Sequence, residues 1–331
     1  MSYRVLPRSV RVVFPAAVVI ALAAVPPAPA LAFTGGNHET VTFTGGNHET
    51  VTRAALPWEP ATLSAMAGAR DGAINADDHG GYFLLGPLHC DNADYLAARH
   101  VQDYPRSRDE ATTELLACIR SSVARFRNAI RAADGLVDAH GKVRADQSDL
   151  SSPCIWEKAS GRAKCDVLEQ LGRGWHSVQD FYSHSNWSDR AAPGAVGLSN
   201  PPGLARADVA PFLDIRRYST MKDADWTRDA RARMPVDLTT GCYPDFDSTG
   251  VKSEDCAGRV THNRALNKDT AASLRSKTGD NFNRAVSGAT AETTRQWNDF
   301  KAELVRTYPD DRRGEQMVCA LVHDDPVSSC P

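Results

Sequence analysis

The sequence has little excess of charge of either sign, and several familiar catalytic motifs are missing from it. Its 331 residues carry 38 Lys and Arg against 41 Asp and Glu, a formal net charge of −3. Such a chain lacks the basic surplus that sequence-independent binding to duplex DNA or to anionic lipid requires. It contains no GxSxG, no P-loop and no GxGxxG after a strand, which excludes the common serine-hydrolase and nucleotide-binding classes. Strand-like alternation is nearly absent, so we expect an all-α fold.

Long apolar runs are lacking after residue 32. The one apolar run spans fourteen residues, 12–25, follows three arginines and is broken by prolines before the small-x-small sequence at 30–32. This is the pattern of a signal peptide, whereas a membrane anchor needs about 18 or more apolar residues in a row. We therefore expect residues 1–32 to be a signal peptide, cleaved after Ala32, and the protein to be secreted and soluble. The remaining chain would carry 35 basic and 41 acidic side chains, a net charge of −6.

The eight cysteines contain no CxxC pair, which argues against a thiolate metal site. In an exported chain they are expected to form disulfides. The short separations favour three local bridges and leave the two remaining cysteines for the fourth. The predicted pairs are Cys154–Cys165, Cys242–Cys256, Cys319–Cys330 and Cys90–Cys118.

The chain after the signal peptide opens with a perfect tandem repeat, FTGGNHETVT, at 33–42 and 43–52. We interpret 33–52 as a duplicated leader; the alternative is that the second copy uses its histidine in a site. His48 is favoured over His38 because Thr50 or Thr52 can cap a helix that begins near Arg53.

Helical periodicity dominates the rest of the chain. It predicts a single helical domain over 53–331, with a loop-rich insertion at 188–260 where Gly, Pro and turn residues accumulate. The predicted helices span 61–75, 109–134, 164–186 and 281–306. On the second of these, four arginines between residues 120 and 131 are flanked by acidic residues on both sides, which indicates a solvated face rather than a nucleic-acid patch. Trp187 and Trp297 are expected in the core.

The stretch HSVQDFYSHSNW at 176–187 is the most informative part of the sequence. His176, Asp180 and His184 are spaced by four residues, so all three project from one face of a helix. Two imidazoles and a carboxylate on a buried helix suit Zn²⁺ or a similar divalent ion, and the central Asp can bridge two ions. The alternative is a polar patch in which Asp180 only accepts hydrogen bonds. Further donors of the same types lie elsewhere in the chain: Asp77, His89, Asp91, His262 and Asp269.

This stretch resembles the motif of the Het-C family, the fungal heterokaryon-incompatibility proteins and their secreted bacterial relatives such as the CinY proteins. The resemblance continues, in the family's order, through residues 43–280. It includes NHETVTRAAL at 47–56, INADDH at 74–79, PLHCDNADY at 87–95, LTTGCYPD at 238–245 and THNRALNKD at 261–269.

The Het-C family is in turn distantly similar to the all-helical zinc-dependent phospholipase C and single-strand nuclease superfamily, which holds three clustered zinc ions. The resemblance implies one metal site of Asp77, His89, His176 and Asp180. It further implies that His48 binds a second ion with Asp180, that His184 and His262 are what remains of a third site, and that Asp91 and Asp269 are outer ligands. Two departures reduce the expected count to one or two metals. The chain would begin with Phe33 instead of a metal-binding Trp, and Leu266 stands where the superfamily has the Glu of a late HxxxE.

Two classes of function follow from the resemblance. The first is a metal-dependent phosphodiesterase acting on phospholipid or nucleic acid, in which Asp77 or a metal-bridging hydroxide serves as base or nucleophile. The second is a non-catalytic extracellular interaction or incompatibility-type protein with a structural or vestigial metal. Zinc is the expected metal. Calcium is the other candidate, since residues 245–250 resemble the start of a calcium loop, although Cys256 stands where an EF-hand needs Glu.

Overall fold

A computed structural model describes residues 47–68, 71–78, 86–156, 161–243 and 255–330 of the chain. The α-helices, in chain order, are α1 Asn47–Ala55, α2 Pro60–Ala67, α3 Arg108–Ala133, α4 Ala145–Ser148, α5 Ala163–His184, α6 Ile215–Ser219, α7 Asp223–Arg233, α8 Asn281–Thr307, α9 Arg313–Val322 and α10 Pro326–Ser329. Short 3₁₀ segments include η1 Ala73–Asp78 and η3 Gly86–Leu88, and η6 His262–Leu266 is a π-helix. The described residues contain isolated β-bridges but no strand, which confirms the all-α prediction.

Several sequence predictions fall on residues outside those ranges. They are the signal peptide over 1–32, the first copy of the repeat with His38, and the calcium-like loop over 245–250. None of the helices in the described ranges is long and apolar enough to cross a membrane.

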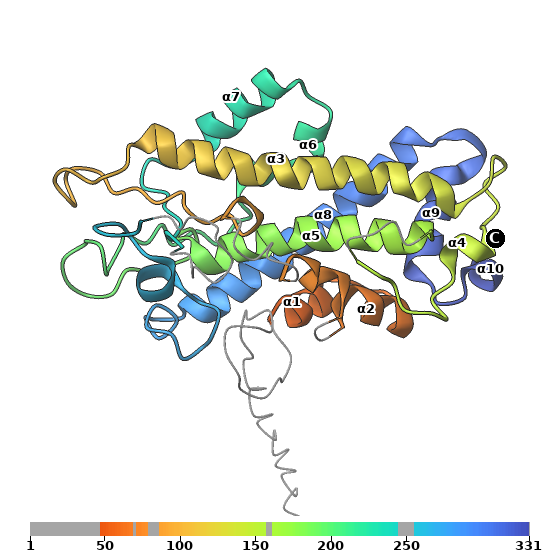
Figure 1. The fold of residues 1–331 in the computed structure, drawn as a ribbon, viewed down its shortest axis with the longest axis horizontal. Helices are drawn as coiled ribbons and strands as arrows, with labels where there is room; N and C mark the ends of the chain where they lie inside the picture. The colour runs from red at the N-terminus through yellow and green to blue at the C-terminus, as the bar shows by residue number, and fades with distance from the viewer. Residues whose placement is uncertain (1–46, 69–70, 79–85, 157–160, 244–254, 331) are drawn as a thin grey trace, which may run out of the picture. The chain divides into compact units, whose positions relative to one another are not determined.

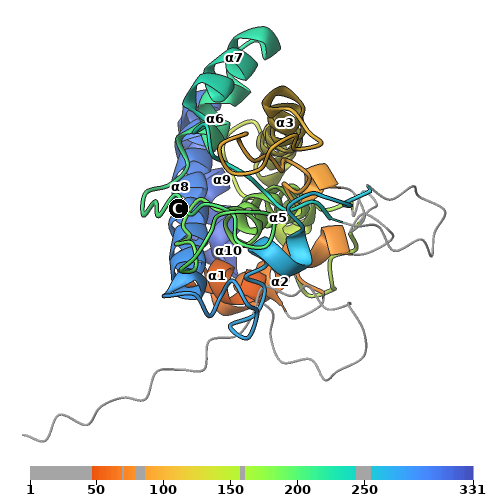
Figure 2. The same cartoon turned by 90° about the vertical axis from the view of Figure 1, so that its left-hand side faces the viewer.

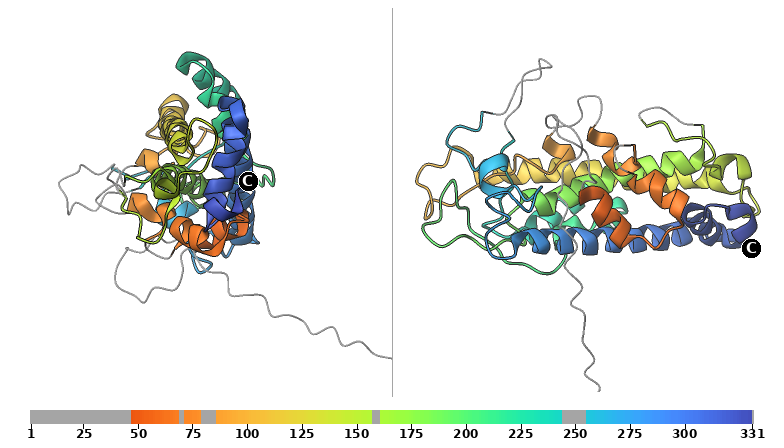
Figure 3. Two further views of the ribbon diagram at one scale, coloured as in Figure 1. Left: turned by 90° about the vertical axis from the view of Figure 1, so that its right-hand side faces the viewer. Right: turned by 90° about the horizontal axis from the view of Figure 1, so that it is seen from below.

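Helix α5 is the central element of the helical body. It lies between α3 and α8, and α1, α2 and η1 cover a third side, as Figures 1 and 2 show from two directions. The view from below in Figure 3 shows α1 and α2 running over the long helices. Every residue of α5 from Leu171 to His184 is buried. A polar side chain on this part of α5 therefore points into the protein, and it needs a partner there.

The other long helices follow their sequence pattern closely. Ser107 and Glu110 form a capping box at the start of α3. One side of α3 forms a buried apolar stripe of Leu115, Leu116, Ile119, Val123, Phe126 and Ile130. Helices α5 and α8 match the predicted ranges to within two residues. Trp187 and Trp297 lie in the core as predicted.

Two helix boundaries differ from prediction. Helix α2 ends at Ala67 and is followed by η1, so the single helix expected over 61–75 is wrong. Helix α1 begins at Asn47, so the residues proposed as caps near Arg53 lie inside the helix and the expected end of the leader at residue 52 falls within it. The described part of 188–260 contains α6 and α7 as well as the 3₁₀ segment Pro211–Leu213 between its loops.

All four predicted disulfides are present, and their Cα–Cα distances of 5.1, 5.5, 5.8 and 5.8 Å lie in the usual range. The Cys90–Cys118 bridge ties the segment after η3 to α3. The Cys242–Cys256 bridge closes the segment that leads to η6. Both tethered segments carry histidines of the candidate site.

Candidate metal centre

The buried face of α5 carries the three predicted residues side by side. Nε2 of His176 lies 3.1 Å from Oδ2 of Asp180, and Nε2 of His184 lies 3.7 Å from Oδ1 of the same carboxylate. The three side chains are at most 7% exposed. The spacing of four therefore places them on one face, as the sequence predicts.

Two further histidines reach Asp180 from other elements. His48, on α1, places Nε2 3.1 Å from Oδ1 of Asp180, and its ring stacks on that of His176 with centroids 4.1 Å apart. His89, after η3, places Nδ1 2.7 Å from Oδ2 of Asp180. We call His48, His89, His176 and Asp180 the Asp180 cluster. Ligand atoms of His48, His176 and Asp180 lie within 4.8 Å of one another, close enough to share one metal ion.

Two histidines of the Asp180 cluster have a defined orientation. Nδ1 of His176 lies 2.8 Å from the carbonyl oxygen of Ile74, and Nδ1 of His48 lies 2.8 Å from Oε1 of Gln179. Both oxygens only accept hydrogen bonds, so each Nδ1 donates. Each Nε2 then faces the Asp180 carboxylate with its lone pair unless a proton or a metal ion lies between the two atoms. This is the usual arrangement of metal-binding histidines, whose other ring nitrogen donates to a carbonyl or carboxylate.

A second group of ligand atoms surrounds His184. Its Nδ1 lies 3.3 Å from Oδ1 of Asp91, and its Nε2 lies 2.9 Å from Oδ1 of Asp269. His262, at the start of the π-helix η6, places Nε2 3.5 Å from Oδ2 of Asp269. We call Asp91, His184, His262 and Asp269 the His184 cluster. Ligand atoms of Asp91, His184 and His262 lie within 4.8 Å of one another.

The His184 cluster contains buried atoms that make no hydrogen bond. They are Oδ1 of Asp91, Nδ1 of His184 and Nε2 of His262, although the first two lie 3.3 Å apart as an ion pair without hydrogen-bond geometry. Leaving buried polar atoms unsatisfied costs about 1–3 kcal/mol each, so natural proteins rarely do so without a reason. Three such atoms that converge from three segments fit a metal ion, which would satisfy all of them.

The charges of the two clusters depend on one another. Burial alone would raise the pKa of the Asp180 carboxyl, but His176, His184 and His48 outweigh it and hold that pKa well below its ordinary value. Burial likewise disfavours the charged form of His184, yet Asp91, Asp269 and Asp180 raise its pKa well above the ordinary value. Against the effect of burial, His184 and Ser183 contribute to lowering the pKa of Asp269 to about 2. The carboxylates of Asp180 and Asp269 are thus held in the charged form by the histidines beside them.

Close backbone contacts bring the ligand-bearing segments to α5. A Cβ on Gly172 would lie 2.3 Å from the carbonyl oxygen of Ala73, so only glycine lets η1 and Ile74 approach the helix. A Cβ on Gly241 would lie 2.3 Å from Cα of His262, while the Gly241 amide donates to the His184 carbonyl at 3.1 Å. These two glycines permit the packing on which both clusters depend.

No family model, curated protein or solved structure matches this chain. The resemblance to the Het-C family stays a prediction that rests on the sequence motifs. The fold and the donor set are therefore interpreted on their own chemistry.

Asp77 is the one predicted metal ligand that lies in neither cluster. Its Oδ1 accepts a hydrogen bond from Arg173, which also donates to Glu169 at 2.9 Å. Its Oδ2 is buried and makes no hydrogen bond. Asp77 lies on η1, three residues after Ile74, and Arg173 lies one turn before His176. Arg173 thus engages one oxygen of Asp77, and both the place of Asp77 in the metal site and its catalytic role stay predictions.

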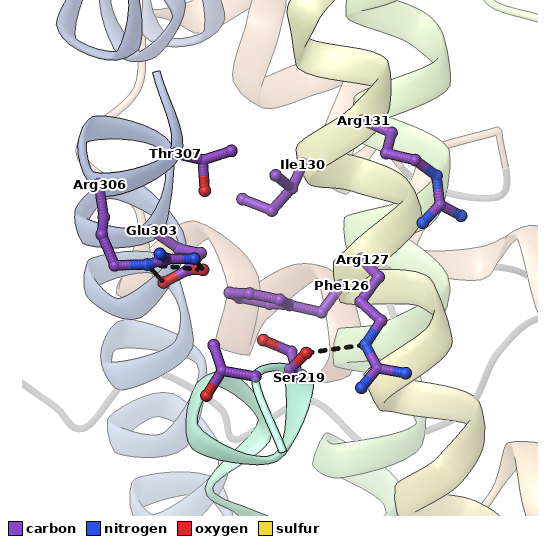
Figure 4. Close-up of a pocket in the computed structure, with 9 residues that line it drawn as sticks. Phe126, Arg127, Ile130, Arg131, Ser219, Glu303, Arg306 and Thr307 are labelled. Atoms are coloured by element: carbon purple, nitrogen blue, oxygen red, sulfur yellow. Dashed lines mark hydrogen bonds and ion pairs between the residues drawn. The ribbon is translucent and has the colours of Figure 1, made fainter. Parts of the chain in front are cut away.

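A separate hollow of about 420 Å³ lies between α3, α6 and α8. No residue of either cluster lines it (Figure 4). Arg127 donates to the Ser219 carbonyl at 2.9 Å, Arg306 pairs with Glu303 at 3.0 Å, and Arg131 bonds to Asn128. The guanidinium groups that line the hollow thus have hydrogen-bond acceptors within the protein, so we do not interpret this hollow as the functional site.

The sequence predicts every member of the two clusters, but it predicts Asp91 and Asp269 only as outer ligands. Both contact His184 directly. It missed the polar residues behind the histidines, Gln179 above all. The one available signal was a glutamine on the buried part of the predicted helix, next to the candidate ligand Asp180.

Proposed function

We propose that this protein is a secreted metal-binding protein whose buried His and Asp side chains hold divalent cations, with zinc as the metal that suits them best. One observation carries the proposal: the Nε2 atoms of His48 and His176 both lie 3.1 Å from the Asp180 carboxylate while their Nδ1 hydrogens are committed elsewhere. Imidazole nitrogens and carboxylate oxygens are common ligands of Zn²⁺. Calcium is disfavoured because it prefers an all-oxygen shell.

The donors would hold up to two ions. The Asp180 cluster offers the ligands for one and the His184 cluster for the other, with Asp180 between them. Asp269 compensates for the missing late HxxxE, since it provides a carboxylate 3.5 Å from His262 where Leu266 cannot. Secretion is supported by the four disulfides and by the signal-peptide pattern.

Hydrolysis of a phosphodiester in a phospholipid or a nucleic acid is the activity that such a centre supports best. A bound divalent ion would lower the pKa of water and polarise a phosphoryl oxygen. In the protein itself, Asp77 is the candidate proton acceptor. Arg173 would orient the Asp77 carboxylate through Oδ1 and leave Oδ2 for the proton.

A non-catalytic extracellular role is the second candidate, and burial favours it. The members of both clusters are 9% exposed or less. A structural metal is typically fully enclosed by protein ligands, whereas a catalytic metal keeps a position open to substrate. Metal-dependent release of product from phosphatidylcholine vesicles or single-stranded DNA separates the two roles.

Elemental analysis of protein purified from a secreting host tests metal binding. The wild type should carry one to two zinc ions per chain. His176→Ala and Asp180→Ala should lose at least one of them because each removes a ligand of the Asp180 cluster. His140→Ala, at an exposed histidine outside both clusters, is the matched control and should keep the wild-type content. Metal-free wild type, or unchanged content in both cluster variants, would refute the proposal.

A further inference from the structure

Gln179 lies on α5 next to Asp180, is fully buried, and makes three side-chain contacts. Its Oε1 lies 2.8 Å from Nδ1 of His48. Its Nε2 donates to Oγ1 of Thr52 and to Oγ1 of Thr293, each at 3.0 Å. The amide thus connects α1, α5 and α8 at the point where His48 reaches the Asp180 cluster.

Thr293 fixes the direction of these hydrogen bonds, because its own hydroxyl hydrogen is already engaged. The hydroxyl of Thr293 donates its only hydrogen to the carbonyl of Ala289, at 2.9 Å. Oγ1 of Thr293 is therefore an acceptor, and the group of Gln179 that faces it must be the NH₂. Once the NH₂ faces the two threonines, Oε1 faces His48, and a carbonyl oxygen there requires a hydrogen on Nδ1 of the ring.

We propose that Gln179 and Thr293 are positioning residues that hold the hydrogen of His48 on Nδ1 and so keep Nε2 as the nitrogen directed to the cluster. Ile74 does the same for His176 through its backbone carbonyl. His48 lies on a separate helix and has a side-chain partner, which makes its orientation open to mutation. The consequence for metal affinity rests on the proposed function, whereas the position of the hydrogen does not.

The two possible positions of the His48 hydrogen give opposite interactions with Asp180. With the hydrogen on Nδ1, the Nε2 lone pair faces the carboxylate and both can bind one cation. With the hydrogen on Nε2, the ring donates a hydrogen bond to Asp180, and that hydrogen occupies the space where a cation would bind. We call the hydrogen bonds that join Thr293, Gln179 and His48 the relay. The relay therefore opposes a hydrogen bond from His48 to Asp180 that would compete with a bound cation.

Thr293→Val and Thr293→Ser form the matched pair that tests the proposal. Valine keeps the shape of threonine but cannot accept from Gln179, while serine keeps the hydroxyl. Long-range ¹⁵N–¹H NMR on metal-free protein, with His48 assigned from its absence in His48→Gln, reports which ring nitrogen carries hydrogen. Wild type and Thr293→Ser should carry a hydrogen on Nδ1 of His48, and Thr293→Val should populate the form with hydrogen on Nε2 alone.

Gln179→Glu and Gln179→Leu provide a second reading if Thr293→Val does not fold. Glutamate still accepts from Nδ1 and should keep the wild-type pattern; leucine cannot, and should shift the hydrogen to Nε2. In variants that bind zinc, loss of the relay should weaken affinity about 10- to 100-fold. An unprotonated Nδ1 in the wild type, or an unchanged ring in both Thr293→Val and Gln179→Leu, would overturn the inference. Absence of zinc in a wild type with protonated Nδ1 would overturn the proposed function alone.

Discussion

At the scale of single residues, Asp180 is the centre of the site. Four imidazoles lie within 3.7 Å of its two oxygens, from His48, His89, His176 and His184. A buried carboxylate with so many nitrogen neighbours costs free energy unless positive charge compensates it. The histidines supply that charge as protons, or a metal ion supplies it in their place.

The sequence predicts that Asp180 lies beside His176 and His184 because a spacing of four fixes the helix face. His48 and His89 were expected near Asp180 only from the resemblance to the Het-C family. It could not predict that Asp91 and Asp269 contact His184, since these lie in irregular segments whose path depends on packing. Asp77 shows the same limit: the resemblance that implies a metal ligand there gave no sign that Arg173, from another element, would occupy one of its oxygens.

Lys164 gives a prediction about pH at the residue scale. Its ammonium is buried and donates to the His323 carbonyl at 2.6 Å. Burial lowers its pKa from 10.5 to about 8, although Asp324 and Glu59 act in the opposite direction. Between these pH values the unfolded chain binds the proton and the folded chain does not. The free-energy cost of burying the Lys164 ammonium on folding is therefore complete below pH 8, and it disappears as the pH rises towards 10.5.

We expect the unfolding free energy of the wild type, relative to Lys164→Met, to increase by up to about 3 kcal/mol across that interval. Urea unfolding of both proteins at the two ends of the interval measures it. Lys222→Met, at an exposed lysine, should show no such trend. A difference between wild type and Lys164→Met that does not change with pH would be inconsistent with a buried charge at this position.

At the scale of elements, the helices were predictable and the contacts between them were not. The apolar stripe of α3 and the pattern of α5 and α8 specify helices because each has a periodic face to bury. Helix α1 was missed at its start because residues 43–52 were interpreted through their repeat. The approach of η1 to α5 depends on Gly172, and a glycine alone does not reveal which segment it admits.

Gly172 and Gly174, two residues apart on α5, separate the effect of the contact with η1 from the effect of replacing any glycine in the helix. Gly172→Ala places a Cβ 2.3 Å from the Ala73 carbonyl and should destabilise the fold by about 1–3 kcal/mol, with weaker metal binding as Ile74 moves. Gly174→Ala meets only the Arg125 side chain, at 3.4 Å, and should stabilise the helix by up to about 1 kcal/mol. Chemical denaturation of both variants gives the comparison. Equal stability changes would mean that the Gly172 contact is not needed.

At the scale of the whole molecule, the disulfides differ in whether they fix a segment of the candidate metal centre. Cys90 has a φ of 54° and lies between His89 and Asp91, one residue from each cluster. Its bridge to α3 closes 28 residues, whereas Cys319–Cys330 closes 11 at the end of the described chain. Loop-closure entropy gives both bridges a similar stabilisation of about 3 kcal/mol.

Their removal should therefore lower stability alike but affect metal binding differently. The double variant Cys90→Ala with Cys118→Ala should lose metal affinity because the segment with His89 and Asp91 is no longer fixed. The double variant Cys319→Ala with Cys330→Ala should retain it. Thermal unfolding and zinc titration of both proteins provide the measurement, and equal affinity in the two would show that the first bridge has no role in the site.

We predict a cation at Asp180, and crystallography across the zinc absorption edge tests this most directly. The predicted result is an anomalous peak about 2.0–2.2 Å from Nε2 of His48 and of His176 and from an oxygen of Asp180. A second peak at the His184 cluster would bring the count to two. Crystals grown with zinc that show no peak there, and histidines that donate hydrogen bonds to Asp180 instead, would contradict the account.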